Sequence, residues 1–257
     1  MKHMSFSALK NWNQCPYYYK LTYIDGIRKF VGNHYTAFGT ALHEVCEKKA
    51  EDFSFSNEEQ TFELSFLREL QQLPKEVLEN VKEKDISQMR EQGKKLSKLA
   101  IPYLKNHFGD FTVVSTEEDI YESIENFQDY NFKGFIDLVI KTSDGKYHII
   151  DWKTCSWGWD SKRKSDPMTT YQLTYYKHFY NKKHNIPLDE IETHFALLKR
   201  TAKKDLVEIF RVTSGNRKIS NALDLLNKAL FNINSGTFIK NKLSCSKCEF
   251  NNTKECP

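Results

Sequence analysis

The sequence predicts an α/β protein whose helices flank a mixed central β-sheet. Three observations lead to this fold class. Residues 57–108 are charged and carry apolar side chains at helical spacing, residues 111–153 alternate with a period of two, and both patterns then recur up to residue 232. Helices before an antiparallel meander, followed by a helix, further strands and a last helix, are typical of an α/β sandwich. A chain of 257 residues, 39% of them hydrophobic, can bury such a core.

The N-terminal third is predicted to be helical. Apolar residues recur at roughly helical spacing over residues 5–19, where a serine at position 5 or 7 can cap the helix and Cys15-Pro16 interrupts it. A second helix is expected to begin near Phe38-Gly39. With the charged, periodic segment that follows, it predicts a helical lobe over about residues 38–108.

The rest of the chain alternates between strand and helix patterns. Three strands are predicted at residues 111–121, 132–141 and 147–153, with a tight turn at 143–146. Then follow a helix at 169–180, strands at 192–198 and 206–212, and a helix at 218–232. The tail, 243–257, is polar and rich in cysteine, and Leu243 and Phe250 are nearly its only apolar residues. We therefore expect metal–thiolate bonds to order the tail.

Charge and cysteine content suggest a location and a class of partner. The formal net charge of +4 comes from 38 basic and 34 acidic residues, so nucleic acid is a compatible partner that composition alone does not demonstrate. No window approaches the roughly 18 apolar residues of a membrane helix, and no apolar run follows the N-terminal positive charge. We expect a cytoplasmic protein without membrane partners. In that reducing compartment, clustered cysteines favour a metal or cluster over disulfides.

Two acids and a lysine form the central pattern. Asp137 follows Gly134-Phe135-Ile136 in one predicted strand, and Asp151 ends the apolar stretch of the next. Neighbouring strands lie about 5 Å apart, so the hairpin can bring both carboxylates to one divalent cation, such as Mg²⁺. In Asp151-Trp152-Lys153 the outer side chains share one face and the indole points the other way. Such a lysine can orient water or stabilise charge on a phosphorane.

Five ordered motifs resemble one known family, the RecB-like and Cas4-like branch of the PD-(D/E)XK nucleases. The matching segments are residues 5–9 with Trp12 and Cys15-Pro16, Gly39–Glu44, Gly134–Asp137, Asp151–Thr154, and Gln172-Leu173 with Tyr176. The resemblance implies a single nuclease domain over residues 1–257. It also implies a restriction-endonuclease-like core over about 111–232, with the helical lobe and the cysteine-rich tail attached to it.

The resemblance also implies roles for individual residues. His43, Asp137, Asp151 and the carbonyl of Trp152 would bind Mg²⁺ or Mn²⁺, and Lys153 would be catalytic. Gln172 and Tyr176 would position DNA or support the site; four residues apart, they share a helix face. A further acid on the preceding strand would be Glu117 or Glu118, and the sequence does not choose between them.

The cysteines form a second candidate site. Cys245, Cys248 and Cys256 are close in sequence, and a fourth ligand must come from elsewhere, with Cys15 as the candidate. One N-terminal and three C-terminal cysteines resemble the iron–sulfur members of the same family, which implies a 4Fe-4S cluster that joins the chain ends. Four thiolates would also bind zinc. Cys46 and Cys155 are expected to be small buried hydrophobes.

The expected function is DNA hydrolysis, as an exonuclease on single strands or DNA ends in recombination, repair, phage replication or CRISPR prespacer processing. Partners would be DNA and helicase, recombination or CRISPR proteins. Trp157-Gly158-Trp159 followed by Lys162-Arg163-Lys164 fits single-stranded DNA, although loop packing and solvated charge explain these residues equally well. The alternatives are a non-catalytic DNA-binding subunit with a structural cluster, and a nuclease acting on RNA.

Overall fold

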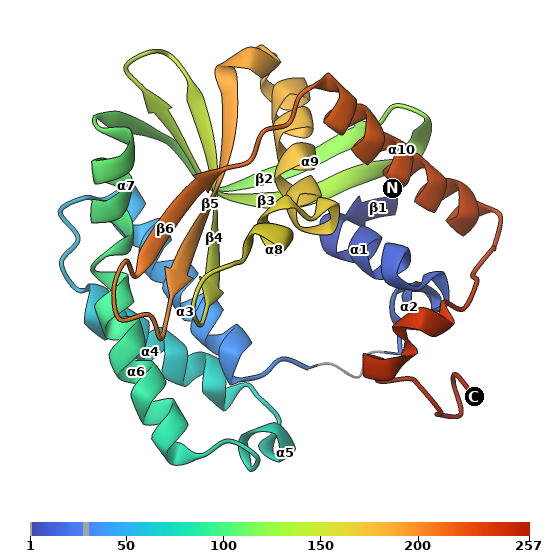
Figure 1. Cartoon of the computed structure of the whole chain (residues 1–257), viewed down its shortest axis with the longest axis horizontal. Helices are drawn as coiled ribbons and strands as arrows, with labels where there is room; N and C mark the ends of the chain where they lie inside the picture. Colours follow the sequence, from blue (N-terminus) through green and yellow to red (C-terminus); the bar gives the residue numbers. More distant parts are fainter. Residues whose placement is uncertain (1, 28–30) are drawn as a thin grey trace.

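The central sheet confirms the predicted fold class. The computed structural model describes residues 2–27 and 31–257 and shows a mixed sheet between helices (Figure 1). Its six described strands have the order β1-β3-β4-β5-β6, and β2 also pairs with β3. The β1–β3 and β4–β5 pairs are parallel, and the other pairs are antiparallel. The strands are β1 (Lys2–Ser5), β2 (Phe111–Ile124), β3 (Phe127–Thr142), β4 (Tyr147–Cys155), β5 (Ile191–Lys199) and β6 (Val207–Arg211).

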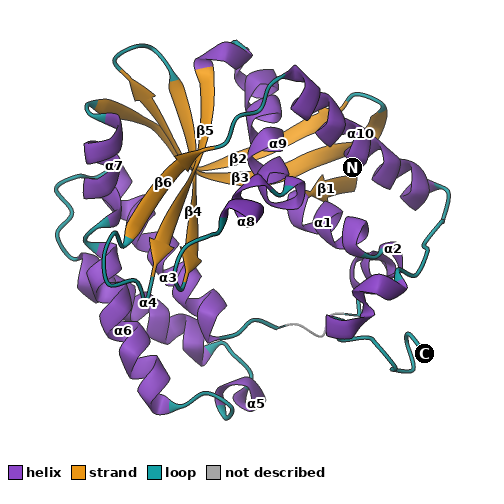
Figure 2. Cartoon of the chain, viewed as in Figure 1, coloured by secondary structure: helices purple, strands orange, loops and turns teal. Residues whose placement is uncertain are grey.

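Helices cover both faces of the sheet (Figure 2). One layer contains α1 (Phe6–Gln14), α2 (Pro16–Tyr19), α9 (Pro167–His184) and α10 (Asn216–Asn234). The other contains α3 (His34–Glu51), α4 (Glu58–Gln71), α6 (Glu83–Ser97) and α7 (Ala100–Phe108). The shorter elements are α5 (Lys75–Leu78), α8 (Ser161–Ser165), a π-helical turn (Lys20–Ile24) and two 3₁₀ turns (Leu188–Glu190 and Lys242–Lys247).

Alternation along the strands divides the core into two parts. On β4, Ile149 packs with α1, α9 and α10, whereas Ile150 and Trp152 pack with α3, α4, α6 and α7. The helices predicted as a lobe therefore share a hydrophobic core with the sheet. Gly93 of α6 permits close packing there, because a Cβ atom at this position would lie 1.9 Å from the ring of Phe62.

Local capping explains where the first helices begin. Ser5 caps α1 by accepting a hydrogen bond from the backbone N–H of Ala8, and the helix ends before Cys15, whose backbone is extended. The helix predicted to begin near Phe38 is α3, which begins earlier, at His34. The reason is a capping box, in which Asn33 and Thr36 satisfy each other's backbone N–H groups.

The sequence patterns missed one strand and shortened others. Residues Lys2–Ser5 form β1, although four residues are too few to reveal a period of two. The predicted strand at 132–141 is the central part of β3, which spans Phe127–Thr142. The predicted helix at 169–180 lies inside α9, which has Asp166 as its N-cap and Pro167 in its first turn. No helix among the described residues is long and apolar enough to cross a membrane.

Candidate active site

The site lies where one edge of β3 is left open. β2 pairs along one edge of β3, whereas the other edge pairs first with β1, at Tyr130–Lys133, and then with β4, at Leu138–Lys141. Residues 134–137 between these two pairings have no described strand on that edge. Asp137 uses the opening, since its Oδ2 accepts a hydrogen bond from the backbone N–H of Trp152 at 2.7 Å. The carboxylate of Asp137 thus accepts a hydrogen bond that a backbone carbonyl of β3 would accept if the pairing of β3 with β4 continued to this point.

Asp151 and Lys153 extend from β4 on the face covered by α9. Asp151 is buried; its Oδ1 accepts a hydrogen bond from Gln172 Nε2 at 2.9 Å, and its Oδ2 lies 2.5 Å from Lys153 Nζ. The indole of Trp152 points to the opposite face and is buried in the core beneath α3. The lysine is therefore held beside the acid by the alternation of the strand.

The layer on the other side of the sheet contributes His43. This residue extends from α3, and its Nδ1 lies 3.5 Å from Asp137 Oδ1. The opening beside β3 thus allows side chains from both helix layers to meet at one point.

Glu117 and Glu118 point in different directions. The register of β2 and β3 pairs Thr116 with Leu138 and Glu118 with Ile136, so Glu117 lies opposite Asp137. Glu118 instead forms ion pairs on α9, at 2.6 Å to Lys183 and 2.9 Å to His184. Glu117 also has a φ of +46°, a strained conformation for a residue with a side chain. Of the two candidate acids, the structure brings Glu117 to the site.

Burial and opposing charges shift the pKa values of the central groups. Burial raises the pKa of Asp151 to about 6; Asp137 adds to this rise, and Lys153 opposes it. Burial also raises the pKa of Asp137, but the hydrogen bond and charge of His43 outweigh it, so the net shift is downward. Without a metal, the two carboxylates are balanced by Lys153 and by His43, whose pKa rises because the hydrogen bond and charge of Asp137 outweigh burial. Two carboxylates and a neighbouring imidazole are donor types that divalent cations take from proteins.

Close backbone approaches explain two glycines of the site. A Cβ atom on Gly134 would lie 2.7 Å from the ring of Tyr176, so only glycine lets this tyrosine pack against β3. Tyr176 in turn accepts a hydrogen bond from Gln172 at 3.2 Å. A Cβ atom on Gly39 would lie 3.3 Å from Thr154 Oγ1, so α3 also packs closely on β4. The Gly134–Asp137 motif therefore contacts the motif of Gln172 and Tyr176, and the Gly39–Glu44 motif contacts the Asp151–Thr154 motif.

Two cavities flank the site. One, of about 340 Å³, is lined by residues of β1, α1, β3 and α9, including Gln172 and Tyr176. The other, of about 240 Å³, is lined by Tyr35, Thr154, Arg200 and their neighbours. A larger cavity of about 780 Å³ lies between the β2–β3 turn, α9 and α10, and none of the site residues lines it. The first cavity adjoins the site through Gln172, which donates to Asp151, and the second is lined by Thr154, the residue after Lys153.

The sequence model of the PD-(D/E)XK nuclease superfamily matches residues 3–253. The chain belongs to this superfamily. Among solved structures, a protein from Eubacterium rectale described as a "putative exonuclease" is similar at a TM-score of 0.62 and 12% identity, covering 100% of this chain and 90% of that one. The structure of SSO0001 matches at a TM-score of 0.39 and 18% identity, with 91% of each chain covered. A comparison with curated proteins gives no match.

The N-terminal and C-terminal segments of the chain meet at a second site. We call it the chain-end junction and define it as Cys15 with residues 239–257. The backbone N–H of Asn241 donates to Cys15 Sγ at 3.3 Å, and Cys245 Sγ lies 3.7 Å from the carbonyl of Asn241. None of the six cysteines forms a disulfide. The structure thus brings the N-terminal cysteine to the segment that carries Cys245.

The tail packs more than its composition suggested. Phe250 is fully buried and makes an edge contact with the ring of Tyr18 at 5.5 Å, and the hydroxyl of Tyr17 donates to the carbonyl of Glu255 at 3.1 Å. Leu243, by contrast, is 96% exposed. One aromatic anchor and a few hydrogen bonds therefore hold the tail in this structure. The expectation that metal–thiolate bonds order the tail left these contacts out.

The remaining predicted residues divide between core and surface. Cys46 is buried as expected, whereas Cys155 is only partly buried. Trp159 packs against Phe195 at 5.0 Å, so loop packing explains it, but Trp157 is 74% exposed. In the basic run that follows, Arg163 stacks on the indole of Trp159 and Lys164 pairs with Glu208, whereas Lys162 is exposed.

Proposed function

We propose that this chain is a metal-dependent deoxyribonuclease, an exonuclease that acts on single-stranded DNA or DNA ends. The observation that carries the proposal is the meeting of Asp137, Asp151 and Lys153 with His43 at an opening of the sheet, beside two cavities. Paired carboxylates with an adjacent lysine are suited to metal-assisted phosphodiester hydrolysis. The structural neighbour described as an exonuclease is consistent with this activity.

The donor set assigns a task to each residue. Mg²⁺ or Mn²⁺, held by His43, Asp137, Asp151 and the carbonyl of Trp152, would supply charge neutralisation and an activated water. Lys153 stays protonated, because the charges of Asp151 and Asp137 outweigh burial and raise its pKa. Its ammonium group can therefore orient the attacking water and stabilise the charge that develops on the phosphate. Gln172 and Tyr176 hold Asp151 in position and line the substrate cavity.

Exposed aromatic side chains near basic groups support a single-stranded substrate. Tyr35 is 53% exposed with the Arg200 guanidinium 5.2 Å from its ring centre, and Phe135 is 46% exposed with Lys133 Nζ at 5.6 Å. Each pair contributes to one of the two cavities beside the site. Unpaired bases stack on such rings while cations contact the backbone. The alternative substrate, RNA, offers the same stacking surfaces and phosphates.

The chain-end junction supports a bound cofactor. In our proposal Cys15, Cys245, Cys248 and Cys256 hold a 4Fe-4S cluster, with zinc as the alternative for four thiolates. Such a cluster would support our proposal that the chain belongs to the RecB-like and Cas4-like branch. The associated processes would be recombination, repair, phage replication or CRISPR prespacer processing in the cytoplasm, with a helicase or another partner protein.

The decisive test is a cleavage assay of the full chain on end-labelled single- and double-stranded DNA, with Mg²⁺ or Mn²⁺ and with EDTA. We expect progressive shortening from the ends of single strands, abolished by EDTA and restored by either metal. A matched RNA strand of the same sequence tests the alternative substrate. DNA binding without cleavage under every metal condition would replace the enzyme by the other candidate, a non-catalytic DNA-binding subunit.

A further inference from the structure

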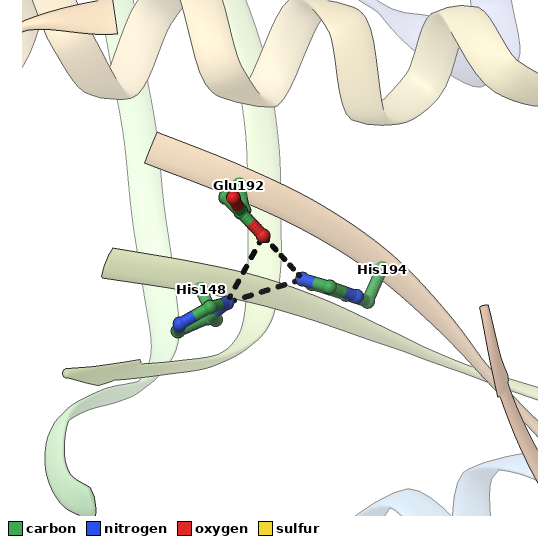
Figure 3. A group of neighbouring side chains, drawn as sticks. All are labelled: His148, Glu192 and His194. Carbon is green, nitrogen blue, oxygen red and sulfur yellow. Dashed lines mark hydrogen bonds and ion pairs between the residues drawn. The ribbon is translucent and has the colours of Figure 1, made fainter. Parts of the chain in front are cut away.

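A third group of ligand-type side chains lies on the opposite face of β4 from Asp151. His148 on β4 and Glu192 and His194 on β5 point toward one another (Figure 3). The Nδ1 of His148 lies 3.1 Å from the Nε2 of His194, and each nitrogen lies 3.8 Å from Glu192 Oε2. The three ligand atoms all lie within 4.8 Å of one another, and no other three His, Cys, Asp or Glu side chains do so among residues 2–27 and 31–257.

We propose that His148, Glu192 and His194 bind one Zn²⁺ ion, with water in the fourth position, at a site separate from the active centre. Zinc prefers imidazole nitrogen and carboxylate oxygen at about 2.0–2.2 Å in a tetrahedron, so neighbouring donors lie about 3.3 Å apart. The observed separations of 3.1 and 3.8 Å bracket that value. Small side-chain movements are enough to form the site.

Hydrogen bonds outside the group orient its donors. The Nε2 of His148 contacts Thr142 Oγ1 at 3.0 Å, which leaves Nδ1 directed at the site. Glu192 Oε1 receives Lys146 Nζ at 3.2 Å and an Arg211 nitrogen at 3.0 Å, which leaves Oε2 for the ion. Such outer contacts are usual around metal-ligating histidines and carboxylates. The two cations also repel a dication, but both reach solvent, which screens them.

The facing nitrogens of the two histidines are buried and share one contact. His148 and His194 are 6% and 3% exposed, and His148 Nδ1 lies 3.1 Å from His194 Nε2. In the metal-free arrangement one of the two facing nitrogens must carry a proton, whereas an ion uses both lone pairs.

The location indicates a structural role. His148 and His194 join β4 to β5, and the ring of His194 meets those of His107 and Phe108 at the end of α7. An ion there would link β4 to β5 three residues before Asp151. We therefore expect zinc to raise thermal stability.

Zinc stoichiometry and melting temperature of the full chain test the proposal. The variants are Glu192→Gln, which keeps shape and hydrogen-bonding capacity, and His194→Gln, with His107→Gln as the matched control on a neighbouring histidine. The active centre and the cysteines can also take up zinc, so the difference between variants is the measurement. We expect wild type and His107→Gln to bind one more zinc per chain than the other two and to gain several degrees more in Tm on zinc addition.

Equal zinc content and equal zinc-induced Tm shifts in all four proteins would overturn the proposal. Should the buried substitutions prevent folding, wild-type crystals soaked in zinc give an independent answer. An anomalous-difference peak between His148 Nδ1, Glu192 Oε2 and His194 Nε2 is the expected result. A soaked crystal without that peak would leave these residues as a hydrogen-bonded cluster and reject the zinc site.

Discussion

The active centre and the chain-end junction both gather potential metal ligands, but different forces hold them. At the active centre, Asp137 and Asp151 come from strands of a buried sheet, and each carboxylate has a hydrogen bond to a fixed donor. At the junction, Cys15 meets a tail whose main apolar anchor is Phe250. We infer that the sheet preserves the geometry of the active centre without metal, whereas the junction would depend on the proposed cofactor. Loss of ligands should therefore stop chemistry at one place and loosen structure at the other.

The largest expected effect comes from removing the central groups. Asp151→Ala and Lys153→Ala should each lower the cleavage rate by more than about 100-fold, because they remove metal binding and charge stabilisation at the reacting phosphate. DNA binding and thermal stability should change little. End-labelled DNA cleavage, a binding titration and a thermal melt measure the three quantities.

Controls for these two variants are Asp110→Ala and Lys10→Ala, which change exposed residues of the same types. Wild-type cleavage by either active-centre variant would end the assignment of chemistry to this site. If Asp151→Ala and Lys153→Ala both lost much of their thermal stability, the contrast between the active centre and the chain-end junction would not hold.

The next effect should appear at the chain-end junction. Cys15→Ser should bleach a brown protein that carries about four iron and four sulfide ions per chain. Cys15 precedes Cys245 by 230 positions, and a cross-link over such a loop is worth about 5 kcal/mol. At about 2 °C or more per kcal/mol, the Tm should fall by roughly 10 °C. Metal analysis, visible absorption and calorimetry provide the measurements.

Cys46→Ser and Cys155→Ser are the matched controls, and neither should change the colour. A colourless anaerobic preparation with one zinc at the junction would substitute zinc for the cluster. Absence of both metals from that place would reject the junction as a cofactor site.

A smaller effect should separate the two glutamates of β2. Glu117→Gln should reduce cleavage by about 10- to 100-fold, because this side chain lies opposite Asp137 and adjusts the charge around the metal ligands. Glu118→Gln should cleave at the wild-type rate, since its partners are Lys183 and His184. Rates at saturating Mg²⁺ compare the pair. The reverse order of activities would assign the third acid of the site to Glu118.

The smallest expected effect lies in the basic run of α8. Lys162→Ala should lower the slope of log K against log salt by about 0.7 for single-stranded DNA, the value for one lost phosphate contact. Lys164→Ala should change the slope less, because Lys164 is paired with Glu208. Binding titrations over a range of salt concentrations give both slopes. Identical slopes for wild type and Lys162→Ala would assign this lysine to plain surface.

Local sequence patterns predicted much of the fold and the residues at the centre of the site. Alternation along the β4 segment placed Asp151 and Lys153 on one face, and the short turn before it placed Asp137 on the adjacent strand. These relations are fixed by covalent neighbours and by the two-residue period of a strand. Sequence alone could therefore name the central acids and lysine and the α/β class.

The tertiary structure decided the relations that depend on pairing between distant segments. The register of β2 against β3 selects Glu117 over Glu118, and Gly134 proves necessary because Tyr176 of α9 packs against it. The meeting of His148 with Glu192 and His194 likewise follows from the register of β4 and β5. No local period encodes such a register, because it is set by the packing of whole elements around a common core.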